Sequence, residues 1–224
     1  MNNIFSIAID GPAGAGKSTI AKAVAKNLGA MYLDTGAMYR TVGLYFSRKG
    51  VEKDTETVAK LAHDMDIGVK FEGGVQRMYL DGEDVTDFIR SPEASMAASA
   101  VSAVPEVRKR LVRLQQDTAK GVSIVMDGRD IGTVVLPNAT LKLFVTATAE
   151  ARAMRRYNDL RAAGLLPKFH DVLDELVERD YNDSHRSTTP LMRAEDAHLL
   201  DTTNMTVNQV ISEVERLLKA AIGG

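Results

Sequence analysis

The sequence predicts an α/β fold, in which helices cover both faces of a doubly wound parallel sheet of five strands. A small antiparallel β insert and a pair of charged helices, over 149–163 and 171–182, complete the fold. Two observations predict this fold. Short apolar runs alternate with segments of helical periodicity, which is typical of a parallel sheet with crossover helices. Residues 67–86 interrupt that alternation with strand-like spacing and two glycine turns, which indicates the insert.

The amino-terminal part predicts a strand, a glycine-rich loop and a helix. Residues 4–9 form a nearly continuous apolar run, which is typical of a buried parallel strand. Apolar residues recur at helical spacing from Ile20 to Leu28, and Gly29 supplies a helix stop. A short second strand over 31–33 and helices over 38–46 and 58–65 follow.

The middle of the chain predicts the insert and one clear helix. Gly73-Gly74 and Asp81-Gly82 are hairpin signals, so residues 67–86 are expected to form an antiparallel meander. Pro105 suits the first turn of a helix, and apolar residues at i, i+4 and i+7 after it predict a helix over 105–119.

The carboxyl-terminal half predicts three more strands and three helices. Apolar runs at 122–126 and 141–145, and a shorter one at 198–200, complete the expected sheet. Two charged helices are expected over 149–163 and 171–182. Thr206 is the expected N-cap of a last helix, whose apolar residues fall on one face.

Composition excludes several classes of protein and site. The 224 residues, 45% hydrophobic and 26% charged, match one folded globular unit with appended subdomains. Zero cysteines exclude disulfides and thiolate metal sites, and four histidines leave little for a histidine metal cluster. The net charge of −2 argues against generic binding to nucleic acid or to anionic membranes. Without a membrane-length apolar run or a leader pattern, the expected location is the cytoplasm.

A phosphate-binding loop follows the first strand. Residues 11–18 fit G-x-x-x-x-G-K-[ST] in full, between a strand and a helix, so the fold is expected to be of the P-loop NTPase type. Lys17 is expected on the β- and γ-phosphates, and Ser18 on Mg²⁺. Asp127 is a candidate second ligand of the metal shell, although any aspartate at a strand end would look similar. The residues expected to contact the nucleotide here are Gly11, Pro12, Ala13, Gly14, Ala15, Gly16, Lys17, Ser18 and Thr19.

Arginine-rich segments elsewhere predict a second anion site. No Asn-Lys-x-Asp or Leu-Ser-Gly-Gly-Gln string occurs, which disfavours regulatory GTPases and transporter ATPases. Because ligands of doubly wound sheets bind at the carboxyl ends of strands, Arg40 and Arg129 are expected on the P-loop side. The segments concerned are Asp34-Thr-Gly-Ala-Met-Tyr-Arg40, Val107-Arg108, Asp127-Gly-Arg-Asp-Ile-Gly-Thr133 and Arg179-Asp-Tyr-Asn-Asp183-Ser-His-Arg186.

With these segments the chain resembles, over essentially its whole length, the bacterial cytidylate kinase family of nucleoside monophosphate kinases. The resemblance implies Mg²⁺-dependent transfer of a phosphoryl group from ATP to CMP and dCMP by a monomer, and the charge balance adds the expectation that neither nucleic acid nor a membrane is a partner. It implies catalytic roles for Lys17, Arg129 and Arg186. It places Arg40, Arg129, Arg179 and Arg186 on the acceptor phosphate, Asp183 on the sugar hydroxyl, and Ser99, Arg108 and Asp130 around the cytosine edge.

Further expectations follow from the same resemblance. Thr35 stands where many relatives carry serine at the acceptor site, and Arg155 and Arg156 are the preferred lid contacts to ATP. The implied regions are a core of about 1–34, 120–148 and 187–224, a monophosphate-binding region with the β insert of about 35–119, and a lid of about 149–186.

Two alternative functions stay open on the residues. The first is a kinase that prefers UMP or another monophosphate. The second is a P-loop ATP-binding regulator or ATPase, whose second pocket senses a ligand without phosphorylating it.

Overall fold

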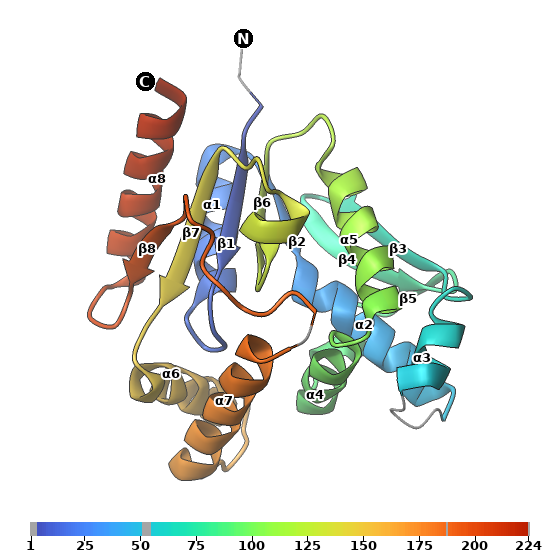
Figure 1. Ribbon diagram of the computed structural model, residues 1–224. Helices are drawn as coiled ribbons and strands as arrows, with labels where there is room; N and C mark the ends of the chain where they lie inside the picture. Colours follow the sequence, from blue (N-terminus) through green and yellow to red (C-terminus); the bar gives the residue numbers. More distant parts are fainter. Residues whose placement is uncertain (1–3, 51–54, 187, 224) are drawn as a thin grey trace. The chain divides into compact units, whose positions relative to one another are not determined.

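The computed structural model describes residues 4–50, 55–186 and 188–223 (Figure 1). The chain divides into two compact units. One contains the residues up to Ala30 and those from Ser123 onward, and the other runs from Met31 to Val122. The finer division into core, monophosphate-binding region and lid stays a prediction.

Among the residues that the structure describes, the main sheet has five strands, as predicted, and their order is β2-β6-β1-β7-β8. β1 pairs in parallel with β6 and with β7, and β7 pairs in parallel with β8. Asp10 lies opposite Gly128, so the carboxyl ends of β1 and β6 are level with each other. The strands are β1 (Ser6–Asp10), β2 (Met31–Asp34), β6 (Ile124–Gly128), β7 (Leu141–Thr146) and β8 (His198–Asp201).

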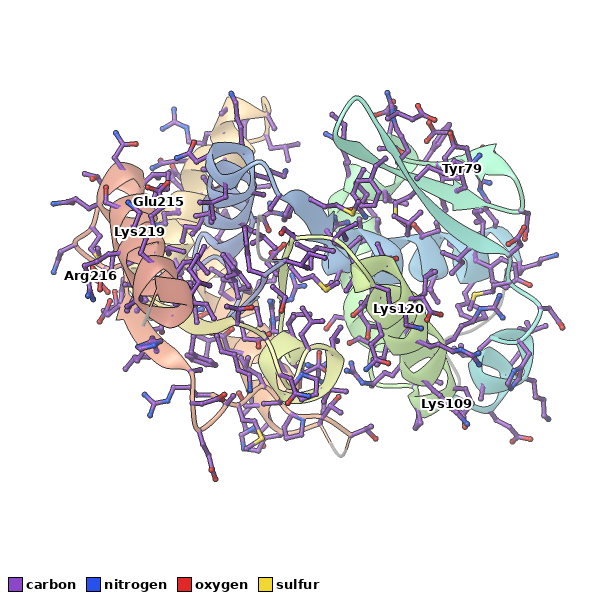
Figure 2. All side chains as sticks on the ribbon, turned by 90° about the horizontal axis from the view of Figure 1, so that it is seen from above. Tyr79, Lys109, Lys120, Glu215, Arg216 and Lys219 are labelled. Atoms are coloured by element: carbon purple, nitrogen blue, oxygen red, sulfur yellow. The ribbon has the colours of Figure 1, made fainter. Side chains whose placement is uncertain are left out.

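Within its described residues, the first unit has four α-helices: α1 (Lys17–Leu28), α6 (Ala149–Ala162), α7 (Phe169–Ser184) and α8 (Val207–Gly223). α1 packs against β1 and β6, α8 packs against α1 and β7, and α6 and α7 form a helical hairpin (Figure 1). α8 begins with a capping box, because the Thr206 hydroxyl accepts from the Gln209 N–H while Gln209 Oε1 accepts from the Thr206 N–H. Its charged residues Arg216 and Lys219 are exposed (Figure 2).

The described part of the second unit joins four α-helices and a short 3-10 helix (Phe88–Arg90) to a three-stranded antiparallel sheet. Gly73 and Gly74 connect β3 to β4 with φ values of +58° and +78°, which glycine adopts without strain, and this confirms the predicted hairpin. The helices are α2 (Thr35–Arg48), α3 (Thr55–Leu61), α4 (Pro92–Val101) and α5 (Pro105–Ala119), and the strands are β3 (Ile67–Glu72), β4 (Val75–Leu80) and β5 (Glu83–Asp84).

Several boundaries differ from those predicted. α4 was not predicted, because its alanine-rich sequence shows little amphipathic contrast. α2 begins at Thr35 rather than near Met38, since the Asp34 carboxylate accepts from the Ala37 N–H and caps the helix there. α3 ends at Leu61, four residues before the predicted end. Within the described residues, no helix combines the length and apolar character needed to cross a bilayer.

Candidate active site

The loop between β1 and α1 is shaped by glycines. Gly11 has a φ of +144°, and a Cβ built on it would lie 1.9 Å from the Val145 carbonyl oxygen. Gly16 has a φ of +85° and precedes the first residue of α1. Only glycine fits the first position, and glycine adopts the left-handed backbone of the second without strain. The loop therefore leads into a helix N-terminus, where backbone N–H groups and the helix dipole favour an anion.

Lys17 is a buried cation at the start of α1. Its ammonium donates to the Pro12 carbonyl oxygen at 2.6 Å, which holds it over the loop. Burial lowers the pKa of Lys17 well below its ordinary value, and the nearby charges of Arg129 and Arg179 lower that pKa further, against the opposing effect of Asp127. An anion bound beside Lys17 would reverse this effect, because negative charge favours the protonated amine.

Ser18 and Asp127 lie side by side. The Ser18 hydroxyl donates to Asp127 Oδ2 at 2.7 Å, and Asp127 is buried at the end of β6. A hydroxyl and a carboxylate next to a phosphate-binding loop are hard oxygen ligands of the kind that Mg²⁺ binds together with substrate phosphates and water. The pair therefore fits the predicted metal position. Thr19, the next residue, is exposed.

Three arginines of the first unit surround Asp183. Arg129 Nε donates to Asp183 Oδ2 at 2.6 Å, and Arg186 Nη2 lies 3.7 Å from Oδ1. Burial opposes ionisation of Asp183, but Arg129, Arg186 and Arg179 together hold its pKa below its ordinary value. The charges of Arg129 and Arg179 also lower the pKa of Lys17. The predicted phosphate contacts of this unit therefore belong to one electropositive cluster, which consists of Lys17, Arg129, Arg179 and Arg186.

Asp10 fixes the backbone that carries Arg129 and Asp130. Its two carboxylate oxygens accept from the backbone N–H groups of Ile131 at 2.8 Å and Gly132 at 2.7 Å. Asp130 is buried at the start of the π-helical turn Ile131–Val135. Sequence reasoning missed Asp10, which carries no motif role and whose partners lie more than a hundred residues away.

The α6–α7 hairpin is bonded to the phosphate loop. Arg152 Nη1 donates to the Ala13 carbonyl oxygen at 2.9 Å, and Asp180 Oδ1 accepts from the Ala13 N–H at 3.2 Å. Arg152 Nη1 also donates to Asp180 Oδ2, and Ala13 packs into the apolar core of the hairpin. Arg152 is therefore a buried support of the loop. Asp180 was missed.

The two preferred lid arginines differ in their surroundings. Arg155 donates through Nη2 to the Thr202 carbonyl oxygen at 2.6 Å and through Nη1 to the Thr202 hydroxyl at 3.1 Å. Its Nη1 also lies 3.5 Å from the Ala15 carbonyl oxygen, next to the phosphate loop. Arg156, the following residue on α6, is half-buried. Arg155 thus lies beside the predicted donor site, and Thr202 is a neighbour that sequence reasoning missed.

In the second unit, Asp34 organises the start of α2. Its Oδ1 caps the helix through the Ala37 N–H at 2.9 Å, and its Oδ2 accepts from Arg40 Nη2, also at 2.9 Å. Thr35, the first residue of the helix, is buried. One carboxylate therefore holds Arg40 directly and caps the helical turn that begins with Thr35.

Ser102, in the turn between α4 and α5, bonds to the other two predicted acceptor residues of this unit, Ser99 and Arg108. The Ser102 hydroxyl donates to the Ser99 carbonyl oxygen at 2.8 Å, and Arg108 Nη1 donates to the Ser102 carbonyl oxygen at 3.3 Å. Arg108 is buried, and its guanidinium carbon lies 5.8 Å from the centre of the Tyr39 ring. Tyr39 and Ser102 thus position Arg108, and Tyr39 lies within the motif that the sequence had already singled out.

Comparison with known proteins places these features in a family. The family model described as Cytidylate kinase matches residues 7–220. A cytidylate kinase of Caldicellulosiruptor saccharolyticus is 50% identical over 98% of this chain and 97% of its own length. One from Pelotomaculum thermopropionicum is 49% identical over 96% of each chain.

A solved structure shares the fold. A protein of Eubacterium ventriosum, described as uncharacterized, superposes on 96% of this chain and 99% of its own with a TM-score of 0.53 and 11% sequence identity. At that identity the likeness concerns the fold alone.

Proposed function

This chain belongs to the cytidylate kinase family, and from that premise we propose that it transfers the terminal phosphoryl group of MgATP to CMP and dCMP. The products are ADP and CDP or dCDP. The observation that carries the proposal is the buried Lys17 of a phosphate loop, which shares its surroundings with Arg129 and Arg179. The positive charges of such a cluster repel one another, and an anionic substrate compensates for this repulsion when it binds.

The donor side of the reaction is assigned to the loop that follows β1. Its backbone N–H groups and the N-terminus of α1 would bind the phosphates of ATP, and Lys17 would neutralise charge on the β- and γ-phosphates. Ser18 and Asp127, hydrogen-bonded at 2.7 Å, would hold Mg²⁺. The metal supplies charge neutralisation between the phosphate oxygens when it is bound.

The acceptor side is assigned to the arginines. Arg129, Arg179 and Arg186 of the first unit, with Arg40 of the second, would bind the α-phosphate of CMP, because guanidinium groups match phosphate oxygens with two donors. Asp183, which pairs with Arg129 and Arg186, would orient these donors and accept from the sugar hydroxyl.

Base recognition is assigned to Ser99, Arg108 and Asp130. Cytosine presents an amine donor beside two acceptors, so a carboxylate next to donors matches its edge. Uracil presents an acceptor in place of that amine and would leave the Asp130 carboxylate unpaired, which disfavours UMP. Arg108 is buried and held by Ser102 and Tyr39, which gives the rigidity that such discrimination needs.

The reaction needs no dedicated base. The second pKa of a phosphate monoester lies near 6, so CMP is mostly a dianion at neutral pH and is already a nucleophile. Catalysis then consists of alignment and charge neutralisation by Lys17 and the arginines. Thr35 keeps a hydroxyl at the acceptor site, and its methyl group is proposed to affect the choice between CMP and dCMP. A monomer in the cytoplasm remains the expected form.

The test is ADP release from ATP, measured with CMP, dCMP, UMP or AMP as the single acceptor. Turnover that requires CMP or dCMP supports the proposal. Turnover that requires only UMP or AMP would favour a kinase of different preference, and turnover without any acceptor would favour an ATPase.

A matched pair of lysine variants tests the donor site. Lys17→Ala is expected to reduce turnover with every acceptor by roughly a hundredfold or more, because a positioned charge at the transferred phosphoryl is lost. Lys26→Ala removes an exposed lysine near the other end of the same helix and is the control. Equal activity of the two variants would contradict the assignment of the phosphate loop.

A further inference from the structure

Gln76 connects the antiparallel insert to Asp34, which precedes Thr35 and pairs with Arg40. Gln76 lies on β4 opposite Phe71 of β3, and it is half-buried. Its Oε1 accepts from the Asp34 backbone N–H at 2.7 Å, and its Nε2 donates to the Asp34 carbonyl oxygen at 3.2 Å. A carboxamide has the donor and acceptor of a peptide group, so Gln76 pairs with the backbone of Asp34 as a neighbouring strand residue would.

Asp34 is the residue on which the start of α2 depends. Its side chain caps the helix at Ala37 and holds Arg40 Nη2 at 2.9 Å. A Cβ on Gly36 would lie 3.0 Å from Arg40 Nη1, so the guanidinium is folded closely over the first turn of α2. Any rotation of the Asp34 backbone would therefore move the Arg40 guanidinium as well.

The insert also holds the opposite end of α2. Arg48, in the last turn, donates to both carboxylate oxygens of Glu83 on β5, at 2.6 and 3.0 Å. Between these contacts, β4 packs against α2, with Met78 and Leu80 buried. The helix that carries Thr35 and Arg40 is thus supported by the insert at both ends, and the Gln76 contact lies at the end with the predicted acceptor residues.

Arg40 keeps donors for a ligand in this arrangement. Its Nη2 is committed to Asp34, and among the described residues its buried Nε has no hydrogen-bond partner. A guanidinium held by one carboxylate through one nitrogen can present its other nitrogens to a phosphate. The orientation of those nitrogens depends on Asp34, and the orientation of Asp34 depends on Gln76.

We propose that Gln76 is a positioning residue for the acceptor phosphate, and that the insert serves the reaction by fixing the Asp34–Arg40 pair through it. This inference rests on the proposed function, in which Arg40 binds the phosphate of CMP. It assigns the insert a role in acceptor affinity rather than in donor binding.

The test uses steady-state kinetics of the full chain with Gln76→Met, which has nearly the same length but neither the donor nor the oxygen acceptor. KM for CMP is expected to rise about tenfold, since both hydrogen bonds to the Asp34 backbone are lost, while KM for ATP is unchanged. Tyr79→Phe is the matched control, because it removes one exposed hydrogen bond, to Glu72, from the same strand (Figure 2).

A double-mutant cycle with Arg40→Ala separates positioning from general support of the fold. If Gln76 acts through Arg40, Gln76→Met changes KM for CMP less than twofold once Arg40 is alanine. A tenfold rise in both backgrounds would overturn the proposal, as would an equal rise in KM for ATP or an effect no larger than that of Tyr79→Phe.

The same series separates the two levels of inference. If Arg40→Ala leaves KM for CMP unchanged, the proposed role of Arg40 is wrong. If Arg40→Ala raises it but Gln76→Met does not, only the role of Gln76 is wrong.

Should Gln76→Met fail to fold, Gln76→Glu replaces it. That variant keeps an acceptor for the Asp34 N–H but places a carboxylate against the Asp34 carbonyl oxygen. A rise in KM for CMP is again expected, and an unchanged value overturns the proposal.

Discussion

Both carboxylate oxygens of Asp10 accept backbone hydrogen bonds, which favours the ionised form, whereas the burial of Asp10 favours the protonated form. Burial raises its pKa to about 6, although the backbone N–H groups of Gly132 and Ile131 and the charge of Lys17 favour the carboxylate. Asp130, a second carboxylate nearby, raises the pKa further. Asp10 therefore holds the backbone after Arg129 at a cost in stability near neutral pH.

This cost predicts a pH dependence of unfolding. A carboxyl whose folded pKa exceeds its unfolded value of 3.8 stabilises the protein below about pH 4, and this contribution is lost as pH rises through about 6. The shift of about two units corresponds to about 3 kcal/mol. Urea unfolding of the natural chain and of Asp10→Asn should show that the natural chain loses about this much relative to the variant between pH 4 and pH 7. A difference between the two that does not change with pH would contradict the assignment.

A second prediction at this scale concerns Asp130. Asp130→Asn should reduce the preference for CMP over UMP, measured as the ratio of kcat/KM values, by roughly ten- to a hundredfold. The reason is that an amide offers either a donor or an acceptor and therefore accommodates both bases. KM for ATP should stay nearly unchanged. Asp159→Asn, at an exposed position on α6, is the control. Equal losses of turnover with both nucleotides would argue against reading of the base by Asp130.

At the scale of elements, α2 and α4 approach each other closely through small residues. A Cβ on Gly43 of α2 would lie 2.7 Å from the Cβ of Ala97 of α4. Ser99 follows two residues after Ala97, so the spacing of the two helices also sets the place of a predicted base contact. Glycine weakens the middle of a helix by about 0.5–1 kcal/mol relative to alanine, so its presence here is explained by the packing.

Gly43→Ala is therefore expected to destabilise the protein by roughly 1–3 kcal/mol through overpacking, although alanine is the better helix former. Ala97→Gly should relieve the clash, so the double variant should be more stable than the sum of the two single effects predicts. Urea unfolding of the three variants gives the coupling. If the changes in unfolding free energy of the two single variants simply add in the double variant, the two helices can move apart at this point without loss of stability.

For the molecule as a whole, charge is balanced globally but not locally. The chain has 28 Lys and Arg against 30 Asp and Glu, yet Lys17, Arg129, Arg179 and Arg186 gather in the first unit. Anion affinity is therefore a property of the site and not of the surface in general, which matches substrates that are small phosphate compounds.

Ligand binding should appear in global stability. A non-hydrolysable ATP analogue with Mg²⁺ at a hundred times its Kd is expected to stabilise the folded chain by about 2.7 kcal/mol, since it binds only the folded state. In Lys17→Ala this stabilisation should largely disappear, while that given by CMP should persist. Thermal unfolding with each ligand separately measures both effects. Loss of the CMP effect in the same variant would indicate that Lys17 supports the whole site rather than the donor alone.

The sequence by itself determined the features that depend on neighbouring residues. The phosphate loop, the hairpin at Gly73, the start of α5 at Pro105 and the cap at Thr206 are local patterns of a few residues, and the structure confirms each of them. The family motifs could be located for the same reason, because each is contiguous in the chain.

Only the tertiary structure decided which residues support the predicted site. Asp10 bonds residues 121 and 122 positions away, Asp180 bonds a residue 167 positions away, and Gln76 bonds one 42 positions away. No periodic pattern links such partners, since periodicity extends only over successive turns or strand residues. Supporting polar contacts arise when distant segments pack, and the burial that makes them strong exists only after the chain has folded.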